Sequence, residues 1–253
     1  MPRRRRHWER QACYHITHRC HNREFRFRFG KYRRMYRQYL FEATKRFNVR
    51  VLSWMVTSNH THLLLTSGDR GTPQISEALQ FVHGEIGQHY NLARRCDGSF
   101  WSNRFHATRI QSGAHLGRGL VYIDLNMVRA GAVDHPSEWI YGTWPETFGL
   151  RQRYRIVNRP TLLNRLQMGN WEAFTRWYKD TLDDLLSRRN ELQKQPFWSS
   201  AIAVGDKEWL SAAARRAGMK RFEIRGGGGI VVDDTADTVK TFFLGCVNQF
   251  KAT

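Results

Sequence analysis

The order of strand-like and helix-like segments in the first half of the chain restricts its fold more than any single residue does. Runs with the alternation or the residue types of β-strands lie at 12–17, 49–57, 60–66 and 104–111. Amphipathic helical patterns lie at 31–47, 73–90 and 115–130. The order β, α, β, β, α, β, α predicts an α+β fold in which helices cover one face of an antiparallel sheet.

Two helix boundaries carry their own signals. Thr72 is the expected N-cap and Pro73 the expected first residue of the second helix, since proline suits a helix start. Gly131 is a fitting residue to follow the third helix.

The chain changes character beyond residue 150. Helical patterns lie at 160–192 and 206–218, and four glycines at 226–229 precede a short β-like run. We therefore expect residues 1–150 to form the main domain with a basic N-terminal arm. Residues 151–253 should form a mainly helical extension that contacts DNA or stabilises the domain.

The charge of the chain points to a polyanion as its partner. The 253 residues carry a net charge of +19, and 33 of the 41 basic residues are arginine. The arginine guanidinium can donate two hydrogen bonds to one phosphate and can also stack on bases, which suits binding to nucleic acid. Residues 1–50 hold 16 basic residues against three glutamates, so the basic surface belongs mostly to the N-terminal part.

Several other classes of protein are disfavoured. The four cysteines are scattered without a CxxC pair, which is typical of free thiols in a reducing compartment. No apolar stretch approaches the roughly 20 residues needed to span a bilayer, and the first residues lack the apolar run of a signal peptide. We expect a cytoplasmic protein without a membrane partner.

One pair of histidines and one tyrosine stand out as candidates for chemistry. Successive side chains of a strand alternate between its faces, so His60 and His62 point the same way and can chelate one metal ion. Tyr122 and Asn126 are four residues apart on a predicted helix, and so lie one above the other. Together they would supply three metal ligands, namely two imidazoles and an amide oxygen, beside a phenol.

This set of groups favours cutting and rejoining a nucleic-acid strand. Neutral ligands leave Mg²⁺ or Mn²⁺ with its full charge and with open positions for phosphate oxygens. A phosphotyrosine keeps the energy of the broken bond, so a free hydroxyl can reverse the cut. A hydrolytic nuclease would instead activate water with a carboxylate, and the sequence has no clustered Asp/Glu group to do so.

Arginines near these elements are candidate DNA ligands. Arg3, Arg4, Arg5 and Arg6 form the N-terminal arm, Arg23 and Arg26 alternate with phenylalanines, and Arg118 and Arg129 share the polar stripe of Tyr122. Alternating arginine and aromatic residues suit a groove that stacks bases and holds phosphates. The same alternation also describes an edge strand with phenylalanine in the core.

Four motifs, in order, resemble the single-tyrosine HUH transposases, and most closely the REP-associated tyrosine transposases. The motifs are Tyr14-His15-Ile16-Thr17, Ser58-Asn59-His60-Thr61-His62-Leu63-Leu64, Phe100-Trp101-Ser102-Asn103-Arg104-Phe105 and the run from Tyr122 to Gly131. The resemblance covers about residues 10–150. Thr61 and Met127 depart from the usual pattern, where a bulky aliphatic residue and a proline are common.

The resemblance implies a ferredoxin-like core that acts on single-stranded DNA bearing a hairpin. It implies that His60, His62 and Asn126 hold the metal, and that Tyr122 attacks the phosphate to leave a 5′-phosphotyrosine and a free 3′-hydroxyl. It also makes Arg104 a candidate DNA ligand, within the third motif. The departures keep one alternative open, a non-catalytic hairpin-binding protein of the same descent. A hydrolytic nuclease acting on RNA or DNA is a second alternative. The oligomeric state, monomer or homodimer, stays open.

Overall fold

The computed structural model describes residues 8–68, 73–151, 153–189 and 192–217, together with the backbone of two further strands. The strands are β1 (Cys13–Arg19), β2 (Val49–Val56), β3 (His60–Ser67), β4 (His106–Ile110), β5 (Ala203–Val204), β6 (Phe222–Arg225) and β7 (Ile230–Asp233). The helices are α1 (Gly30–Arg46), α2 (Ile75–Arg94), α3 (Ala114–Asp124), α4 (Asn126–Arg129), α5 (Trp144–Thr147), α6 (Arg159–Leu166), α7 (Trp171–Ser187) and α8 (Lys207–Arg216). The 3₁₀ turns among the described residues include η1 (His21–Arg23), η2 (Pro136–Glu138) and η4 (Pro196–Ser199).

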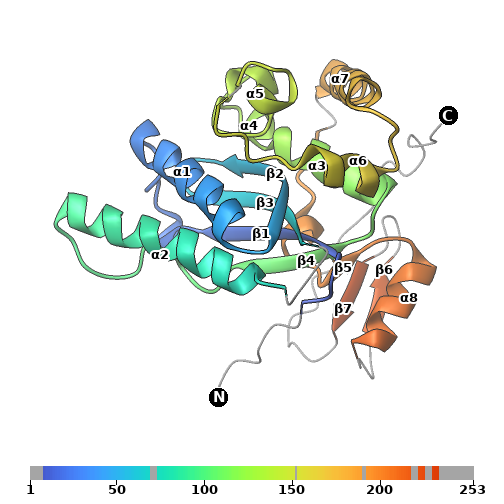
Figure 1. The fold of residues 1–253 in the computed structure, drawn as a ribbon, viewed down its shortest axis with the longest axis horizontal. Coiled ribbons are helices and arrows are strands. Elements are labelled where there is room, and N and C mark those ends of the chain that lie inside the picture. Colours follow the sequence, from blue (N-terminus) through green and yellow to red (C-terminus); the bar gives the residue numbers. More distant parts are fainter. Residues whose placement is uncertain are drawn as a thin grey trace.

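The strands form one sheet in the order β2-β3-β1-β4-β5-β7-β6. Every neighbouring pair is antiparallel except β4 and β5, which run parallel. β1 lies between β3 and β4, and its register places Arg19 opposite His60 and Thr17 opposite His62. The sheet therefore brings the first strand of the chain alongside the histidine pair (Figure 1).

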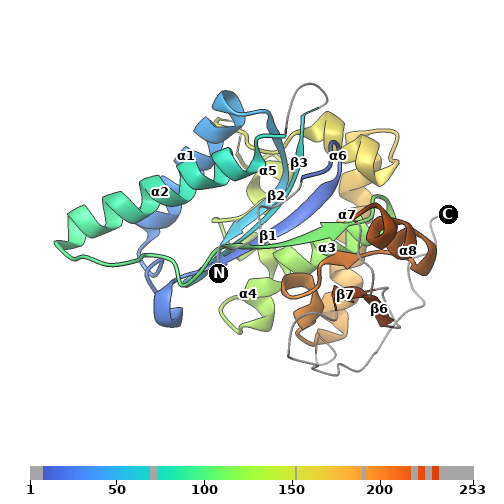
Figure 2. The ribbon, with the colours of Figure 1, turned by 90° about the horizontal axis from the view of Figure 1, so that it is seen from below.

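Helices cover both faces of the sheet, where the sequence predicted one. Leu63 and Leu65 of β3 point to a core shared with α1 and α2, whereas Leu64 points to a core shared with α3, α6 and α7. Such a strand is apolar on both faces, which explains the unbroken leucine run. Figure 2 shows α1 and α2 on one side of the sheet and α3 and α7 on the other. The predicted α+β class with its antiparallel core is confirmed.

The residues after 150 extend this architecture. The predicted helical stretch at 160–192 forms two helices, because the chain turns through Gln167 at φ +59° and α7 restarts with the Asn170 side chain capping the Ala173 amide. Asp206 caps α8 in the same way by accepting from the Trp209 amide. β5 pairs with β4 through Arg109 and Ile110. The C-terminal part therefore contributes α6 and α7 to the core that contains Leu64, and it contributes β5, β6 and β7 to the sheet.

Two predicted helix boundaries differ in detail. The expected helix at 115–130 is interrupted at Leu125, whose ψ of 0° separates α3 from α4, and Gly131 follows with a φ of +66°. α2 begins at Ile75 rather than at Pro73, and Thr72 lies outside the described residues. Among the helices described, none is long and apolar enough to cross a membrane.

Candidate active site

His60 and His62 open strand β3 and face one cavity of about 460 Å³. Their rings lie 4.8 Å apart between centroids. The Nδ1 atom of His60 lies 2.7 Å from Asn59 Oδ1 and 2.9 Å from Thr57 Oγ1. Since the amide oxygen can only accept, His60 Nδ1 carries the proton and its Nε2 keeps a lone pair.

A chain of hydrogen bonds fixes the second histidine in the same tautomer. His15 of β1 donates from Nδ1 to the Trp198 carbonyl oxygen at 2.8 Å, so its Nε2 must accept. That Nε2 lies 2.9 Å from His62 Nδ1, which therefore donates. The lone pair of His62 is left on Nε2, the atom that faces the cavity. An outer partner that orients a metal-ligating imidazole acts in this way.

Both imidazoles are held neutral, as metal ligands must be. Burial is the largest cause that lowers the pKa of His60 to about 3, and the positive charges of Arg19 and Lys194 lower it further. Burial also lowers the pKa of His62 well below its ordinary value, with His60 and His15 adding to the effect.

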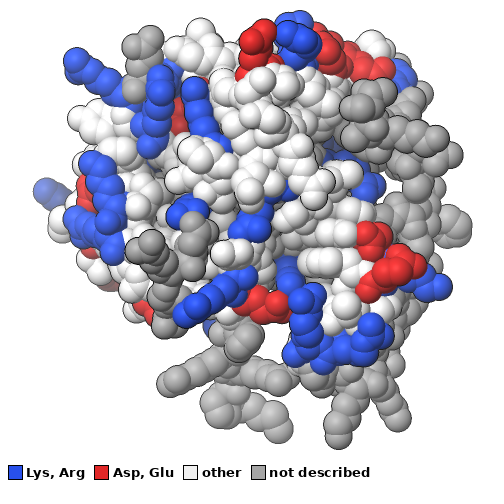
Figure 3. All heavy atoms as spheres, turned by 45° about the vertical axis from the view of Figure 1, so that its right-hand side comes forward, with Lys and Arg blue, Asp and Glu red and all other residues white. Residues whose placement is uncertain are grey.

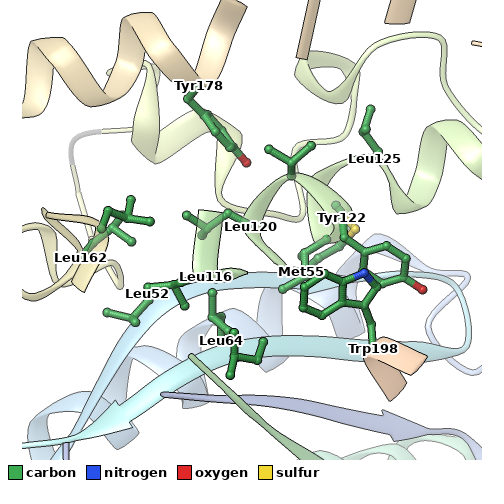
Figure 4. Packing of buried hydrophobic residues seen from close by; sticks show 14 of the residues in the cluster. Leu52, Met55, Leu64, Leu116, Leu120, Tyr122, Leu125, Leu162, Tyr178 and Trp198 are labelled. Atoms are coloured by element: carbon green, nitrogen blue, oxygen red, sulfur yellow. The ribbon is translucent and has the colours of Figure 1, made fainter. Parts of the chain in front are cut away.

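Tyr122 lies near the end of α3, with its ring centroid 6.3 Å from that of His62. The ring stacks on Trp198 at 5.6 Å, as Figure 4 shows. The Arg129 guanidinium lies 4.2 Å from the Tyr122 ring centroid, and its Nη2 donates to the Tyr122 carbonyl oxygen. Burial raises the pKa of Tyr122, while Arg129 and Arg19 lower it. The phenol is thus neutral and faces cations that favour its ionised form.

Asn126 completes a set of donors that fits a divalent ion. Its Nδ2 lies 3.1 Å from His62 Nε2, and a half-turn of the amide brings Oδ1 to the same place. Within the described part of the chain, no three His, Cys, Asp or Glu side chains form a metal-binding group. His60, His62 and the Asn126 amide oxygen could hold an ion at this point, since such a neutral set suits a hard cation with phosphate oxygens as its other ligands.

Four cationic side chains line the same cavity. They come from separate parts of the chain: Arg19, Arg104, Arg129 and Lys194. The sequence predicted Arg104 and Arg129 but not Arg19 or Lys194. Arg19 could have been found from the pairing of β1 with β3, which sets it opposite His60. No sequence signal marks Lys194, which lies in the segment before η4. Figure 3 shows Lys and Arg side chains spread over much of one face of the molecule.

The other predicted DNA ligands lie elsewhere. Arg3, Arg4, Arg5 and Arg6 fall outside the described residues. Arg23 is exposed on η1. Arg26 holds its own loop together, because its guanidinium donates to Glu24 and to the Ser99 carbonyl oxygen. Arg118 contacts the His115 ring and is not among the described residues that line the cavity. The break at Leu125 separates it from the Asn126 stripe.

None of the curated proteins matches this chain. A solved structure described as "Structure of the REP associates tyrosine transposase bound to a REP hairpin" is 22% identical, with a TM-score of 0.49, and the match covers 60% of this chain and 89% of that one. The sequence model of the family described as "Transposase IS200 like" matches residues 9–124, from the approach to β1 through Tyr122 to the end of α3. Over this part, slightly less than half of its length, the chain is similar to the IS200-like transposases.

Proposed function

We propose that the protein nicks single-stranded DNA next to a hairpin and transfers the strand through a covalent bond to Tyr122. The observation that carries this proposal is the gathering of Tyr122, His60, His62 and Asn126 around one cavity lined with cations. No Asp or Glu carboxylate is among the described residues that line it. We assign the phenol of Tyr122 as the nucleophile because Arg129 and Arg19 favour its ionised form.

The reaction exchanges one phosphate ester for another. The Tyr122 phenolic oxygen forms a bond to phosphorus, the bond from phosphorus to the 3′ oxygen breaks, and the phenol proton is lost while the departing 3′ oxygen gains one. The products are a 5′-phosphotyrosine and a free 3′-hydroxyl. In the reverse reaction, a 3′-hydroxyl from another strand attacks the phosphorus of the phosphotyrosine. The bond from phosphorus to the tyrosine oxygen breaks, and Tyr122 is released as the phenol.

The side chains around Tyr122 have separate tasks. Arg129 lies over its ring and stabilises the phenolate that forms as the proton leaves. Arg19 and Lys194 come from segments far apart in the sequence and line the cavity, where they would hold the phosphate oxygens. A divalent ion such as Mg²⁺ or Mn²⁺, held by His60, His62 and Asn126, would polarise the phosphate and stabilise its charge. His15 keeps the His62 lone pair directed into the cavity.

We infer the hairpin preference, and a REP-like sequence as the substrate, from the motif resemblance. The same reasoning assigns catalysis to residues 1–150, with residues 151–253 contributing DNA contacts such as Lys194. The hairpin preference and the division of tasks between residues 1–150 and 151–253 are the same whichever divalent metal the protein uses.

A covalent-capture assay tests the proposal. Labelled DNA hairpins with randomised single-stranded flanks are incubated with Mg²⁺ or Mn²⁺ and run on a denaturing gel, and the captured DNA is sequenced. We expect a protein–DNA adduct that needs the metal and disappears in Tyr122→Phe. Tyr154→Phe is the matched control, because Tyr154 is 62% exposed and does not line the cavity.

Each other outcome has a clear meaning. Hairpin binding without any adduct would point to the non-catalytic binding protein. Cleaved DNA with free 5′ ends and no adduct, unchanged in Tyr122→Phe, would point to a hydrolytic nuclease and refute the tyrosine mechanism.

A further inference from the structure

Two phenylalanine side chains are exposed in the loop at residues 20–29, which connects β1 to α1 and contains η1. Phe25 is 63% exposed and Phe29 is 41% exposed. Every other phenylalanine whose burial the structure describes is buried or half-buried. Single exposed apolar residues are common on protein surfaces, whereas two exposed rings within five residues indicate a contact surface. Nothing in the proposed chemistry at Tyr122 uses these rings.

The protein core holds the backbone of this loop in place. Phe27, between the two exposed rings, is fully buried and packs against Phe100, with the ring centroids 5.2 Å apart. The Phe27 amide donates to the Ser58 carbonyl oxygen at 3.0 Å, and the Arg28 amide donates to the Phe25 carbonyl oxygen at 2.9 Å. Because the backbone around Phe25 is already fixed, little conformational entropy is lost when the ring meets a ligand.

The turn before Phe25 has an unusual backbone. Asn22 and Arg23 are both left-handed, with φ of +50° and +58°. Asparagine tolerates this conformation, whereas an arginine there costs free energy. The Arg23 amide donates to the Cys20 carbonyl oxygen at 3.1 Å, which helps to hold the turn. Strained backbone is typical of binding sites, and here the strained residue carries an exposed cation two residues before Phe25.

The loop lies next to the histidine that opens β3. The Asn59 side chain joins the two, because its Nδ2 donates to the Arg23 carbonyl oxygen at 3.0 Å and its Oδ1 lies 2.7 Å from His60 Nδ1. Arg19, which lines the Tyr122 cavity, is the last residue of β1 and directly precedes the loop. A DNA strand that leaves the cavity on the side of Arg19 and His60 therefore reaches the loop.

The charges of this region suit a phosphate backbone. Residues 19–37 hold eight basic side chains against Glu24, and Glu24 is already paired with Arg26 at 2.9 Å. Arg28 is exposed, and its guanidinium lies 4.5 Å from the centroid of the Phe29 ring. Exposed rings among cations fit a single nucleic-acid strand, because its bases stack on the rings and its phosphates pair with the cations. A protein partner would have to supply carboxylates as well as an apolar surface.

We propose that Phe25, together with the Arg28–Phe29 pair, forms a stacking platform for unpaired bases of the DNA strand just outside the Tyr122 cavity. The proposal rests on the function proposed above, because that function places single-stranded DNA in the neighbouring cavity. Phe25 stacks on a base, while Arg23 and Arg28 contact the adjacent phosphates. Since every base has a flat face, the platform holds the strand without selecting its sequence.

Binding of a labelled DNA hairpin with single-stranded flanks tests the platform. The probe is the hairpin that the wild-type protein binds most tightly in the randomised pool, and its Kd is measured by fluorescence anisotropy. Phe25→Ala should raise the Kd about 5- to 150-fold, the factor that corresponds to about 1–3 kcal/mol for one stacked base. Phe25→Trp should keep tight binding, since an indole ring also stacks on a base.

Leu92→Ala is the matched control. Leu92 is 80% exposed, so the variant removes an equally accessible apolar side chain. It lies two residues beyond Tyr90 on α2, and the Tyr90 ring faces Arg26 of the loop. Two residues turn a helix by about 200°, so Leu92 points away from the loop, and Leu92→Ala should bind like the wild type.

Two further readouts separate stacking from a structural role. Each unpaired nucleotide of the probe is replaced in turn by an abasic residue. One position should weaken binding to the wild-type protein by a factor similar to that of Phe25→Ala, and the variant should show no additional loss there. Phe25→Ala should also leave the salt dependence unchanged, because a phenyl ring releases no counterion, whereas Arg28→Ala should reduce the salt slope by about one.

The possible failures are distinct, and thermal melting reports whether each variant is folded. An unchanged Kd in folded Phe25→Ala, an equal loss in Leu92→Ala, or an abasic loss that persists in full in Phe25→Ala would overturn the platform while the covalent adduct still supports the proposed function. A loss specific to Phe25→Ala without any adduct would keep the platform and overturn the proposed chemistry. A protein that binds none of the DNA hairpins would overturn both.

Discussion

The buried carboxyl of Asp124 gives a quantitative prediction about stability. Asp124 is 1% exposed, and its Oδ2 accepts a 2.6 Å hydrogen bond from the Tyr178 hydroxyl of α7. Its Oδ1 has no hydrogen-bond partner among the described residues. Burial raises the pKa of Asp124 from 3.8 to about 7, and the bond from Tyr178 lowers it only in part. Asp124→Asn keeps an acceptor for Tyr178 and removes the charge.

The sign of the effect follows from the raised pKa. Between about pH 4 and 7 the folded state binds a proton that the unfolded state has lost, so the contribution of Asp124 to stability falls as the pH rises. At about 1.4 kcal/mol per pKa unit, the shift to about 7 corresponds to roughly 4 kcal/mol over the whole window. About 2–3 kcal/mol of this falls between pH 5 and 8. The asparagine side chain of the variant would not titrate, so Asp124→Asn should gain stability relative to wild type over this range.

Urea unfolding of both proteins, followed by circular dichroism with EDTA present, measures this difference. The buried histidines have lowered pKa values, so their contribution to stability rises with pH, opposite to that of Asp124. Both proteins share this contribution, so it cancels in the difference between their free energies of unfolding at each pH. Asp183→Asn is the control, since Asp183 is on the same helix as Tyr178 and forms an exposed ion pair with Lys179. Its free energy of unfolding should stay close to that of the wild type, because an exposed ion pair contributes little to stability. If the free energies of unfolding of wild type and Asp124→Asn run parallel from pH 5 to 8, the reasoning about the buried carboxyl is wrong.

Three further predictions concern other parts of the molecule. Gly84→Ala should raise the free energy of unfolding by about 0.5–1 kcal/mol, because alanine favours the helix and its methyl group meets no neighbour; a lower melting temperature would contradict this. His15→Leu removes the acceptor of His62 Nδ1 and should weaken Mn²⁺ binding about 10- to 100-fold in an electron paramagnetic resonance titration, whereas unchanged affinity would show that His15 does not orient His62. DNA affinity should fall steeply with salt as the arginines displace counterions, and a flat dependence would mean that phosphate contacts contribute little.

Much of the first half of the fold is predictable from local patterns. The strands at 12–17, 49–57, 60–66 and 104–111 each overlap an observed strand, because alternating and β-branched residues report local conformation directly. The two-residue period also placed His60 and His62 on one side of β3, and both line the cavity. The roles of His60, His62, Asn126 and Tyr122 stay predictions.

The remaining parts depend on contacts between distant segments. Arg19 and His15 reach the site only because β1 lies next to β3, and strand order is not written in local sequence. Lys194 and Trp198 arrive from about 70 residues beyond Tyr122, ahead of a strand, β5, that is two residues long. The break at Leu125 has no proline or glycine to announce it. The helices α3, α6 and α7 cover the face of the sheet to which Leu64 points, whereas Leu63 and Leu65 point to the opposite face. An unbroken run of leucines does not show which of them face which side.

The hydrogen bond from His15 to the Trp198 carbonyl has a consequence for the timing of synthesis. His15 is translated before Tyr122, while its partner Trp198 and strand β5 come about 80 residues after the tyrosine. At about 5–20 residues per second, a ribosome needs roughly 4–16 seconds to make that stretch. During this interval a nascent chain already contains the three proposed metal ligands and the nucleophile, but lacks Leu192, Lys194 and Ser199, which line the same cavity.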